Sequence, residues 1–383
     1  MDGSLGGART GQESMADSTR ETVEMPVFPR IYATLPSMLR RFDRTARRDR
    51  FTGHTAEDFL LWQEAARKQL RELLGLDQMF SEPSCGSALS PVRRGEVLLP
   101  QGIRREEYTI SAEEDVVLPF YVLVPPDAGR HTRIFLCPPG HGGGGKSTVA
   151  GLREYPAIAE RISLYNYDYG LQLARLGYVA VCPDARGFGE RREDPESASR
   201  LPEALGGDCA RLARMGEPLG IPAAGMLVYD LMRLIDYLVL RDEWDTQQIS
   251  CLGFSGGGMQ TLFLTALEPR VRFAVISGYL YGYRDSLLRQ SWNCSCNYIP
   301  HLFEHFDMGD IASLIAPRPL LVQSCRADRQ NGPEGMDNVY PQTEILRDAY
   351  TLLGHPERFF HDVCEGPHCF HGERLPEIFR QLL

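Results

Sequence analysis

A serine stands at the centre of a glycine-rich pentapeptide in the second half of the chain. Residues Gly253–Gly257 read G-F-S-G-G, with a strand expected at 249–253 and a helix expected at 259–267. A nucleophilic serine at such a strand-to-helix turn has unfavourable backbone angles, and residues two positions away must be small. In this context, the sequence predicts that Ser255 is a nucleophile for acyl transfer rather than part of an ordinary tight turn.

A serine nucleophile also needs a general base and an acid that orients the base, and these are expected in the order serine, acid, histidine. His368 follows a Gly-Pro turn near the end of the chain and is the preferred base, with His371 as the fallback. Asp328, in the loop after a strand expected at 319–323, is the preferred acid. The same loop offers two weaker choices, Glu334 and Asp337.

A second glycine-rich segment follows the strand expected at 133–137. Residues 140–145 read G-H-G-G-G-G. Acyl transfer builds negative charge on the carbonyl oxygen, and backbone N–H groups must be in place to meet that charge. We predict that Gly143 supplies one N–H group and that Gly256, the residue after the nucleophile, supplies the other.

The same segment has a rival interpretation. Gly140–Ser147 also reads G-x-x-x-x-G-K-S, the pattern of a phosphate-binding loop, which would indicate a nucleotide-binding protein. Such a loop should open directly into a helix, but Pro156 soon interrupts the helical pattern. This alternative also leaves the Ser255 turn unexplained, so we disfavour it.

Four further residues are predicted to contact a substrate: His141, Arg186, Trp292 and Tyr298. Arg186 belongs to the string Asp184–Glu190, whose glycines suit a tight loop, and its guanidinium could pair with a carboxylate there. For this string a structural role is favoured over direct catalysis. The aromatic residues lie in a segment that follows a strand, on the side where open α/β sheets bind their ligands.

The order of elements predicts an α/β fold with a mostly parallel, twisted sheet and helices on both faces. Residues 1–26 are expected to be a disordered leader without a signal peptide, and residues 27–90 a helical extension in which the pattern from Tyr32 to about Leu76 is helical. Residues 91–383 would form the catalytic domain. Insertions at about 191–222 and 281–310 are candidates for a cap over the pocket.

Composition narrows the class of partner. The 383 residues carry a net charge of -10, which argues against nucleic acid or an anionic membrane as the main partner. The ten cysteines are scattered, and several lie in apolar runs where a thiol acts as a small hydrophobe. Only Cys294 and Cys296 are close in sequence, and their spacing matches no common zinc motif. We therefore expect reduced cysteines, a cytoplasmic location and no metal.

Taken together, these strings resemble the dienelactone-hydrolase-like and acetyl-xylan-esterase-like branch of the α/β hydrolases. The resemblance covers roughly Phe28 to the C-terminus and rests on the strings His141-Gly142, Asp184–Gly189, Gly253–Gly257, Asp310–Ala312 with Ala316–Pro319, and Gly366–His371. It implies the α/β-hydrolase fold and the serine, acid, histidine triad. In family seven of the carbohydrate esterases a Gln stands in place of Phe188, and dienelactone hydrolases proper have a Cys in place of Ser255.

The sequence thus predicts a serine esterase that cleaves a carboxylic ester, such as a short-chain acyl or acetyl ester, through an acyl-enzyme. The triad requires no cofactor. An amidase or peptidase on the same triad is the near alternative, and a non-catalytic binding protein on the same fold is the remaining one. The expected partner is a small ester molecule, and a homo-oligomer is left open.

Overall fold

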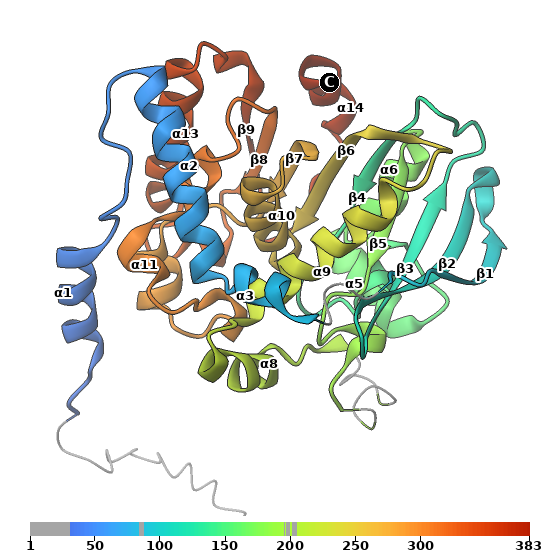
Figure 1. Ribbon diagram of the computed structural model, residues 1–383, viewed down its shortest axis with the longest axis horizontal. Coiled ribbons are helices and arrows are strands. Elements are labelled where there is room, and N and C mark those ends of the chain that lie inside the picture. The colour runs from blue at the N-terminus through green and yellow to red at the C-terminus, as the bar shows by residue number, and fades with distance from the viewer. Residues whose placement is uncertain (1–30, 84–87, 195, 197–199, 201–204) are drawn as a thin grey trace, which may run out of the picture.

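A nine-stranded sheet forms the centre of the molecule (Figure 1). The structure, a computed structural model, describes residues 31–83, 88–194, 196, 200 and 205–383. The strand order is β1-β2-β3-β5-β4-β6-β7-β8-β9; β1, β2 and β3 pair antiparallel, β3 pairs antiparallel with β5, and all other pairs are parallel. The strands are β1 (Val92–Leu98), β2 (Arg104–Glu113), β3 (Val116–Val124), β4 (Arg133–Leu136), β5 (Val179–Pro183), β6 (Asp245–Phe254), β7 (Val271–Ser277), β8 (Leu320–Cys325) and β9 (Phe359–Cys364).

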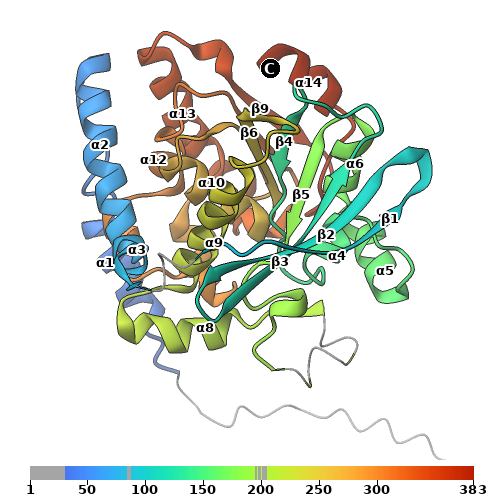
Figure 2. The same cartoon turned by 45° about the vertical axis from the view of Figure 1, so that its right-hand side comes forward.

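Helices cover both faces of this sheet, as Figures 1 and 2 show. One face carries α2 (Ala56–Leu73), α3 (Leu76–Ser81), α9 (Ala223–Leu238), α10 (Gly256–Leu267), α12 (Met308–Ser313) and α13 (Tyr340–Leu352). The other carries α4 (Lys146–Val149), α5 (Pro156–Tyr165), α6 (Tyr169–Arg175) and α14 (Leu375–Leu382). Three further helices are α1 (Leu35–Thr45), α8 (Cys209–Gly216) and α11 (Leu302–His305). The predicted α/β fold class is confirmed.

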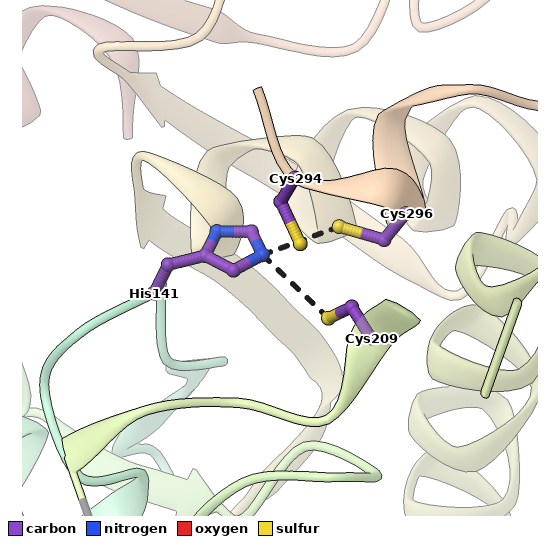
Figure 3. A group of neighbouring side chains, drawn as sticks. All are labelled: His141, Cys209, Cys294 and Cys296. Carbon is purple, nitrogen blue, oxygen red and sulfur yellow. Dashed lines mark hydrogen bonds between the residues drawn. The ribbon is translucent and has the colours of Figure 1, made fainter. Parts of the chain in front are cut away.

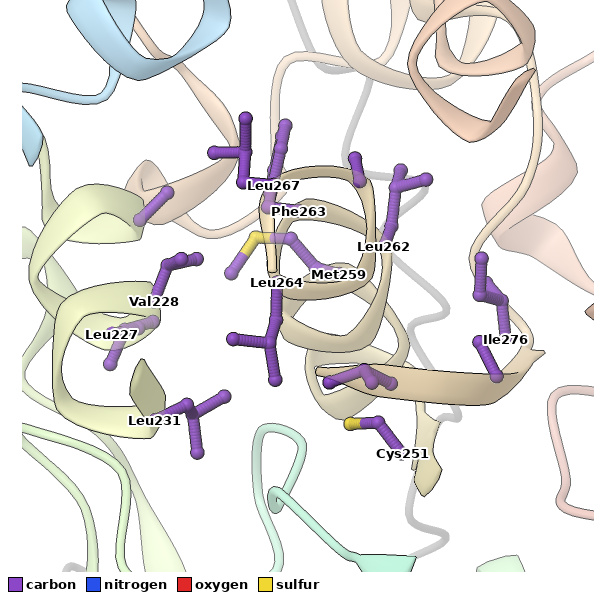
Figure 4. Packing of buried hydrophobic residues seen from close by; sticks show 14 of the residues in the cluster. Leu227, Val228, Leu231, Cys251, Met259, Leu262, Phe263, Leu264, Leu267 and Ile276 are labelled. Carbon is purple, nitrogen blue, oxygen red and sulfur yellow. The ribbon is translucent and has the colours of Figure 1, made fainter. Parts of the chain in front are cut away.

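The strands that bear the site are buried on both faces because their side chains alternate between the two helical layers. In β4, Ile134 and Leu136 face the core under α9 and α10, whereas Phe135 faces the core under α6 and α14. Figure 4 shows the first of these cores, where Val228 and Leu231 of α9 face Leu264 of α10. This double burial fixes the register of the strands, and with it the loops at their ends.

Each expected strand that leads to the site is present, and the differences lie in the helices. The helical pattern expected from Tyr32 to about Leu76 forms two helices, α1 and α2, separated by residues 46–55. Helix α5 begins at Pro156, the residue that we expected to interrupt a helix; Pro occupies its first turn, where no N–H donor is needed. Helix α14 was not predicted. The expected leader at 1–26 lies outside the described residues.

The N-terminal helices dock onto the body of the protein through polar contacts. Arg47, two residues after the end of α1, forms a 2.7 Å ion pair with the buried Asp310. Gln63 of α2 donates from Nε2 to the carbonyl oxygens of Ser313 and Ala316 at 3.0 and 2.9 Å. The chain between Ala316 and Pro317 is a cis peptide. Arg47 and Gln63 therefore attach the N-terminal helices to the catalytic body.

The described helices are each too short or too polar to cross a membrane singly. Within the described residues, no single helix has the length and apolar composition needed to cross a bilayer; only the pair Cys209–Leu219 and Ala223–Leu238, bent by 96°, meets both criteria jointly.

The end of α2 and the start of α9 touch at backbone level. A Cβ added at Gly225 would collide with the carbonyl oxygen of Leu74, which no rotamer change can relieve. We expect Gly225→Ala to lower the free energy of unfolding by about 1–3 kcal/mol, as overpacking does. The matched control is Gly95→Ala in β1, where a Cβ meets nothing within 4 Å and the change should stay within about 0.5 kcal/mol. Urea denaturation of both variants measures the difference, and equal midpoints would contradict the close packing.

Candidate active site

Ser255 lies between the last residue of β6 and the first residue of α10, in a conformation that few side chains adopt. Its φ is 57° and its ψ is -121°. The Ser255 N–H donates to the Ser277 carbonyl at 2.8 Å, which ties the turn to β7. A Cβ at Gly253 would run into the Gly257 backbone, and a Cβ at Gly257 would run into the Pro138 carbonyl. The flanking glycines are therefore required by space, as the pentapeptide indicated.

His368 and Asp328 lie side by side at the ends of neighbouring strands. Nδ1 of His368 is 2.6 Å from Oδ2 of Asp328, whose side chain is 1% exposed. The other carboxylate oxygen accepts from the Gln330 N–H at 2.8 Å. A buried carboxylate on Nδ1 leaves Nε2 of a neutral imidazole as the proton acceptor. The imidazole centroid lies 4.4 Å from the Phe254 ring centroid, with the rings tilted by 35°, which places it next to the Ser255 turn.

The fallback residues lie elsewhere. Nδ1 of His371 lies 3.7 Å from the exposed carboxylate of Glu373. His371 does not pair with Asp328, whose partner is His368. Glu334 pairs with Arg289 at 3.1 Å, and Asp337 lies in a 3₁₀ turn at Gly335–Asn338. Among the described residues no hydrogen bond joins the Ser255 hydroxyl to a partner, and catalytic hydrogen bonds often tighten only in the complex with substrate.

A pocket opens at Ser255. Its volume is about 320 Å³, and it is lined by His141, Ser255, Gly256, Tyr279, Tyr281, Trp292, Asn293, Cys294, Asn297 and Gln330. A second cavity of about 500 Å³ holds Asp328 and His368 and shares Trp292 and Gln330 with the first. Trp292 is 54% exposed and stands between the two. Sequence reasoning did not single out Tyr279 and Tyr281, although it placed the segment from residue 281 near the pocket, because residue type alone does not tell which aromatic side chains face the serine.

The glycine-rich loop after β4 reaches the serine turn at its first residues. A Cβ at Gly140 would lie 3.1 Å from the Gly256 nitrogen, and the His141 imidazole covers Gly256 closely. Gly143 lies farther along the loop, where a Cβ would meet the Tyr167 ring at 3.0 Å. Gly140 and His141, not Gly143, are therefore the residues of this loop that contact the turn.

A carboxylate occupies the position where a phosphate-binding loop would hold its ligand. Oδ1 of Asp184 accepts from the Lys146 N–H at 2.7 Å, and Oδ2 lies 2.8 Å from Nζ of the same lysine. Glu190 also pairs with Nζ at 2.8 Å, and Lys146 is 1% exposed. Because these carboxylates already neutralise the lysine and fill the loop, the nucleotide-binding alternative is not supported.

Two of the four predicted substrate contacts do not line the Ser255 pocket. Arg186 forms ion pairs with Asp230 and Glu113, both at 2.6 Å, and lies beside a separate surface hollow. Its guanidinium is thus held by carboxylates of the protein, as the structural interpretation of this loop anticipated. Tyr298 donates its hydroxyl to the Leu287 carbonyl at 3.1 Å and lies outside the pocket lining. His141 and Trp292 do line it.

Three cysteines and one histidine gather at the wall of the pocket (Figure 3). The group consists of His141, Cys209, Cys294 and Cys296, whose ligand-type atoms all lie within 4.8 Å of one another. A hydrogen bond with Cys209 lowers the pKa of Cys294, and the same bond raises the pKa of Cys209. The spacing of the cysteines along the chain did not indicate this group, because the fold brings together residues from three distant segments.

Comparison with known proteins agrees with this architecture. Residues 32–376 match the model of the Abhydrolase family. The chain is 30% identical over 173 residues to the candidate hydrolase YtaP of Bacillus subtilis (strain 168), a match that covers 44% of this chain and 52% of YtaP. It thus spans about half the length of that curated relative.

Two solved structures share the fold. One is a candidate acetyl xylan esterase from Bacteroides fragilis NCTC 9343, with a TM-score of 0.69 and 20% identity over 87% of this chain and 82% of that one. The other is a glucuronoyl esterase from Solibacter usitatus, with a TM-score of 0.62 and 15% identity over 88% of this chain and 96% of that one.

The buried ion pair under the glycine-rich loop generates a stability prediction. Lys146→Ala leaves the Asp184 carboxylate buried without its ammonium partner, and we expect a loss of about 3–5 kcal/mol in the free energy of unfolding. Arg347→Ala removes the exposed pair with Glu344 and serves as the control, with a loss below about 1 kcal/mol. Urea denaturation measures both. In a thermal shift assay Mg²⁺-ATP should leave the wild type unchanged, and stabilisation by ATP would revive the nucleotide-binding alternative.

Proposed function

Because the chain belongs to the Abhydrolase family, we propose that it is a serine hydrolase and that it cleaves carboxylic esters. The observation that carries the proposal is the Ser255 turn, with φ at 57°, beside a histidine whose Nδ1 is 2.6 Å from a buried carboxylate. The three residues come from the ends of three different strands, in the chain order typical of this fold.

The reaction proceeds in two halves. Ser255 Oγ attacks the acyl carbon, His368 Nε2 takes the hydroxyl proton, and the same nitrogen returns it to the departing alkoxide. Asp328 holds the imidazole in the required tautomer and stabilises its cation. Water then attacks the acyl-enzyme with His368 as the base again, which releases the acid and restores the serine. The residues of this chain supply each proton transfer.

The negative charge on the carbonyl oxygen needs donors at the start of α10. The N–H groups in the first turn of a helix have no partner within the helix, so the Gly256 N–H is available. For the second donor we replace the predicted Gly143 with the backbone N–H of His141. The close approach of Gly140 to the Gly256 nitrogen supports this choice, whereas Gly143 packs against Tyr167.

The pocket favours a small acyl group. A volume of about 320 Å³ admits a short acyl chain beside Ser255, and the adjoining cavity beyond Trp292 leaves room for the alcohol part. One similar structure is named as an acetyl xylan esterase, which supports an acetyl ester as the substrate class. The other is named as a glucuronoyl esterase, which supports ester cleavage but not a small acyl group. The same machinery could cleave an amide, and the test below includes one. The cytoplasmic location stays a prediction, and the oligomeric state is left open.

The first test is covalent labelling. A fluorophosphonate should add a single adduct to the wild type, mapped to Ser255 by peptide mass spectrometry, and the protein should hydrolyse p-nitrophenyl acetate faster than p-nitroacetanilide. Ser255→Ala should lose the adduct and on the order of 10³-fold or more in kcat, because the nucleophile is gone while its turn remains.

Matched histidine variants assign the base. His368→Ala should lose activity to a similar extent, whereas His371→Ala should retain it, since His371 does not contact Asp328. Circular dichroism and the thermal midpoint confirm that both variants fold. A labelled, active Ser255→Ala protein would overturn the proposal, and an active His368→Ala protein would move the base.

A variant of Trp292 tests whether the wall of the pocket contacts the substrate or only supports the structure. Its half-exposed ring borders both cavities, so Trp292→Ala should lower kcat/KM for the best ester about tenfold, mainly through KM. Tyr298→Phe is the control, because its hydroxyl is bonded to a backbone carbonyl outside the pocket lining, and we expect a change within about twofold. Steady-state kinetics on the ester panel measure both. Equal effects in the two variants would show that Trp292 does not bind substrate.

A further inference from the structure

We propose that His141, Cys209, Cys294 and Cys296 bind one zinc ion at the wall of the Ser255 pocket. Figure 3 shows the imidazole of His141 pointing with Nε2 at the thiols, which approach it from the opposite side. Nε2 lies 3.2 Å from the Cys296 sulfur and 3.7 Å from the Cys209 sulfur. All four ligand atoms lie within 4.8 Å of one another.

These separations suit a tetrahedral site. With Zn–S bonds of about 2.3 Å and Zn–N bonds of about 2.0–2.1 Å, neighbouring ligand atoms stand roughly 3.5–3.8 Å apart. The observed separations need only small side-chain adjustments to reach that geometry. Cys209 and Cys296 are buried, and His141 and Cys294 are partly so, which shields the site from bulk water.

The chemistry of the four ligand atoms determines which metal ion the site prefers. Three thiolates and one imidazole are soft and borderline ligands that favour zinc and exclude calcium and magnesium, which prefer oxygen. Zinc binding displaces three thiol protons to solvent and leaves a centre with a formal charge of minus one. Because the protein fills all four positions, no coordination site remains for water or substrate, so the ion is structural.

A second layer of hydrogen bonds already serves the ligands. The Asn297 amide donates to the Cys294 carbonyl at 3.0 Å and points at the Cys296 sulfur at 3.9 Å, as donors to metal-bound thiolates do. Asn297 in turn accepts from the Tyr279 hydroxyl at 2.7 Å. On the other side, the Tyr167 hydroxyl donates to the His141 carbonyl at 3.2 Å and fixes the loop that carries the imidazole.

The position of the site indicates what a bound zinc ion would do for the structure. Cys209 starts α8 within the first predicted insertion, Cys294 and Cys296 belong to the second, and His141 belongs to the glycine-rich loop beside Gly256. One ion would therefore join both insertions to the loop that contacts the serine turn. The site goes beyond the proposed hydrolase activity and can be tested without any substrate.

The test measures metal in the full-length, untagged protein. After exhaustive dialysis against metal-free buffer, plasma mass spectrometry should find about one zinc ion per chain. Cys209→Ser should lose that zinc, whereas Cys364→Ser, at a cysteine outside the group, should keep it. Cobalt substituted into the wild type should give the sulfur-to-metal charge-transfer band and the intense visible absorption of a tetrahedral thiolate site.

A second measurement does not depend on whether a variant folds. Stripping the wild type with a chelator should lower its thermal midpoint, and adding back one equivalent of zinc should restore it. The proposal is overturned by wild-type protein that neither retains nor takes up zinc, by equal zinc in Cys209→Ser, by another metal at the site, or by a disulfide between two of these cysteines in the intact mass. If zinc binds but no ester is cleaved, the proposed function fails and the metal site stands.

Discussion

The close approach of β6, α10 and the loop after β4 at Ser255 is the constraint on which the site depends. A serine can take a φ of 57° only where its surroundings hold it there, since this conformation costs free energy. Here the hold comes from backbone contacts, because Gly253 packs on Gly257 and Gly257 packs on Pro138 without room for a Cβ. The packing of helices on both faces of the sheet therefore maintains the strained conformation of Ser255, and no single hydrogen bond does so alone.

The parallel sheet explains how residues so far apart in sequence can meet at this turn. Strands β6 to β9 run in one direction, so their carboxyl ends lie along one edge and their following loops share one space. Asp328 follows β8 and His368 follows β9, whose last residues pair in register at Cys325 and Cys364. That pairing places the carboxylate and the imidazole 2.6 Å apart across 40 residues of chain.

The sequence predicted what local rules control. Glycine spacing indicated the Ser255 turn, and strand order indicated that Asp328 and His368 would lie at one edge. It could not indicate that Gly140 and not Gly143 meets the turn, because a run of glycines carries no sign of its path. The partners of Arg186 and the thiols around His141 depend on tertiary packing between segments about 40 to 150 residues apart. For the same reason, the spacing of Cys294 and Cys296 did not indicate that Cys209 lies beside them.

The inserted segments have no strands of their own among the described residues, so their order must come from contacts with the catalytic body. Tyr279 bonds to Asn297 in the second insertion, and the Asp208 N–H in the first insertion donates to the Gly187 carbonyl at 3.0 Å. His141 is the point where these links converge, since its imidazole covers Gly256 on one side and faces the thiols on the other. Contacts that fix the positions of the thiols therefore also fix the loop whose backbone would bind the oxyanion. The walls of the pocket and the serine turn are thus positioned together.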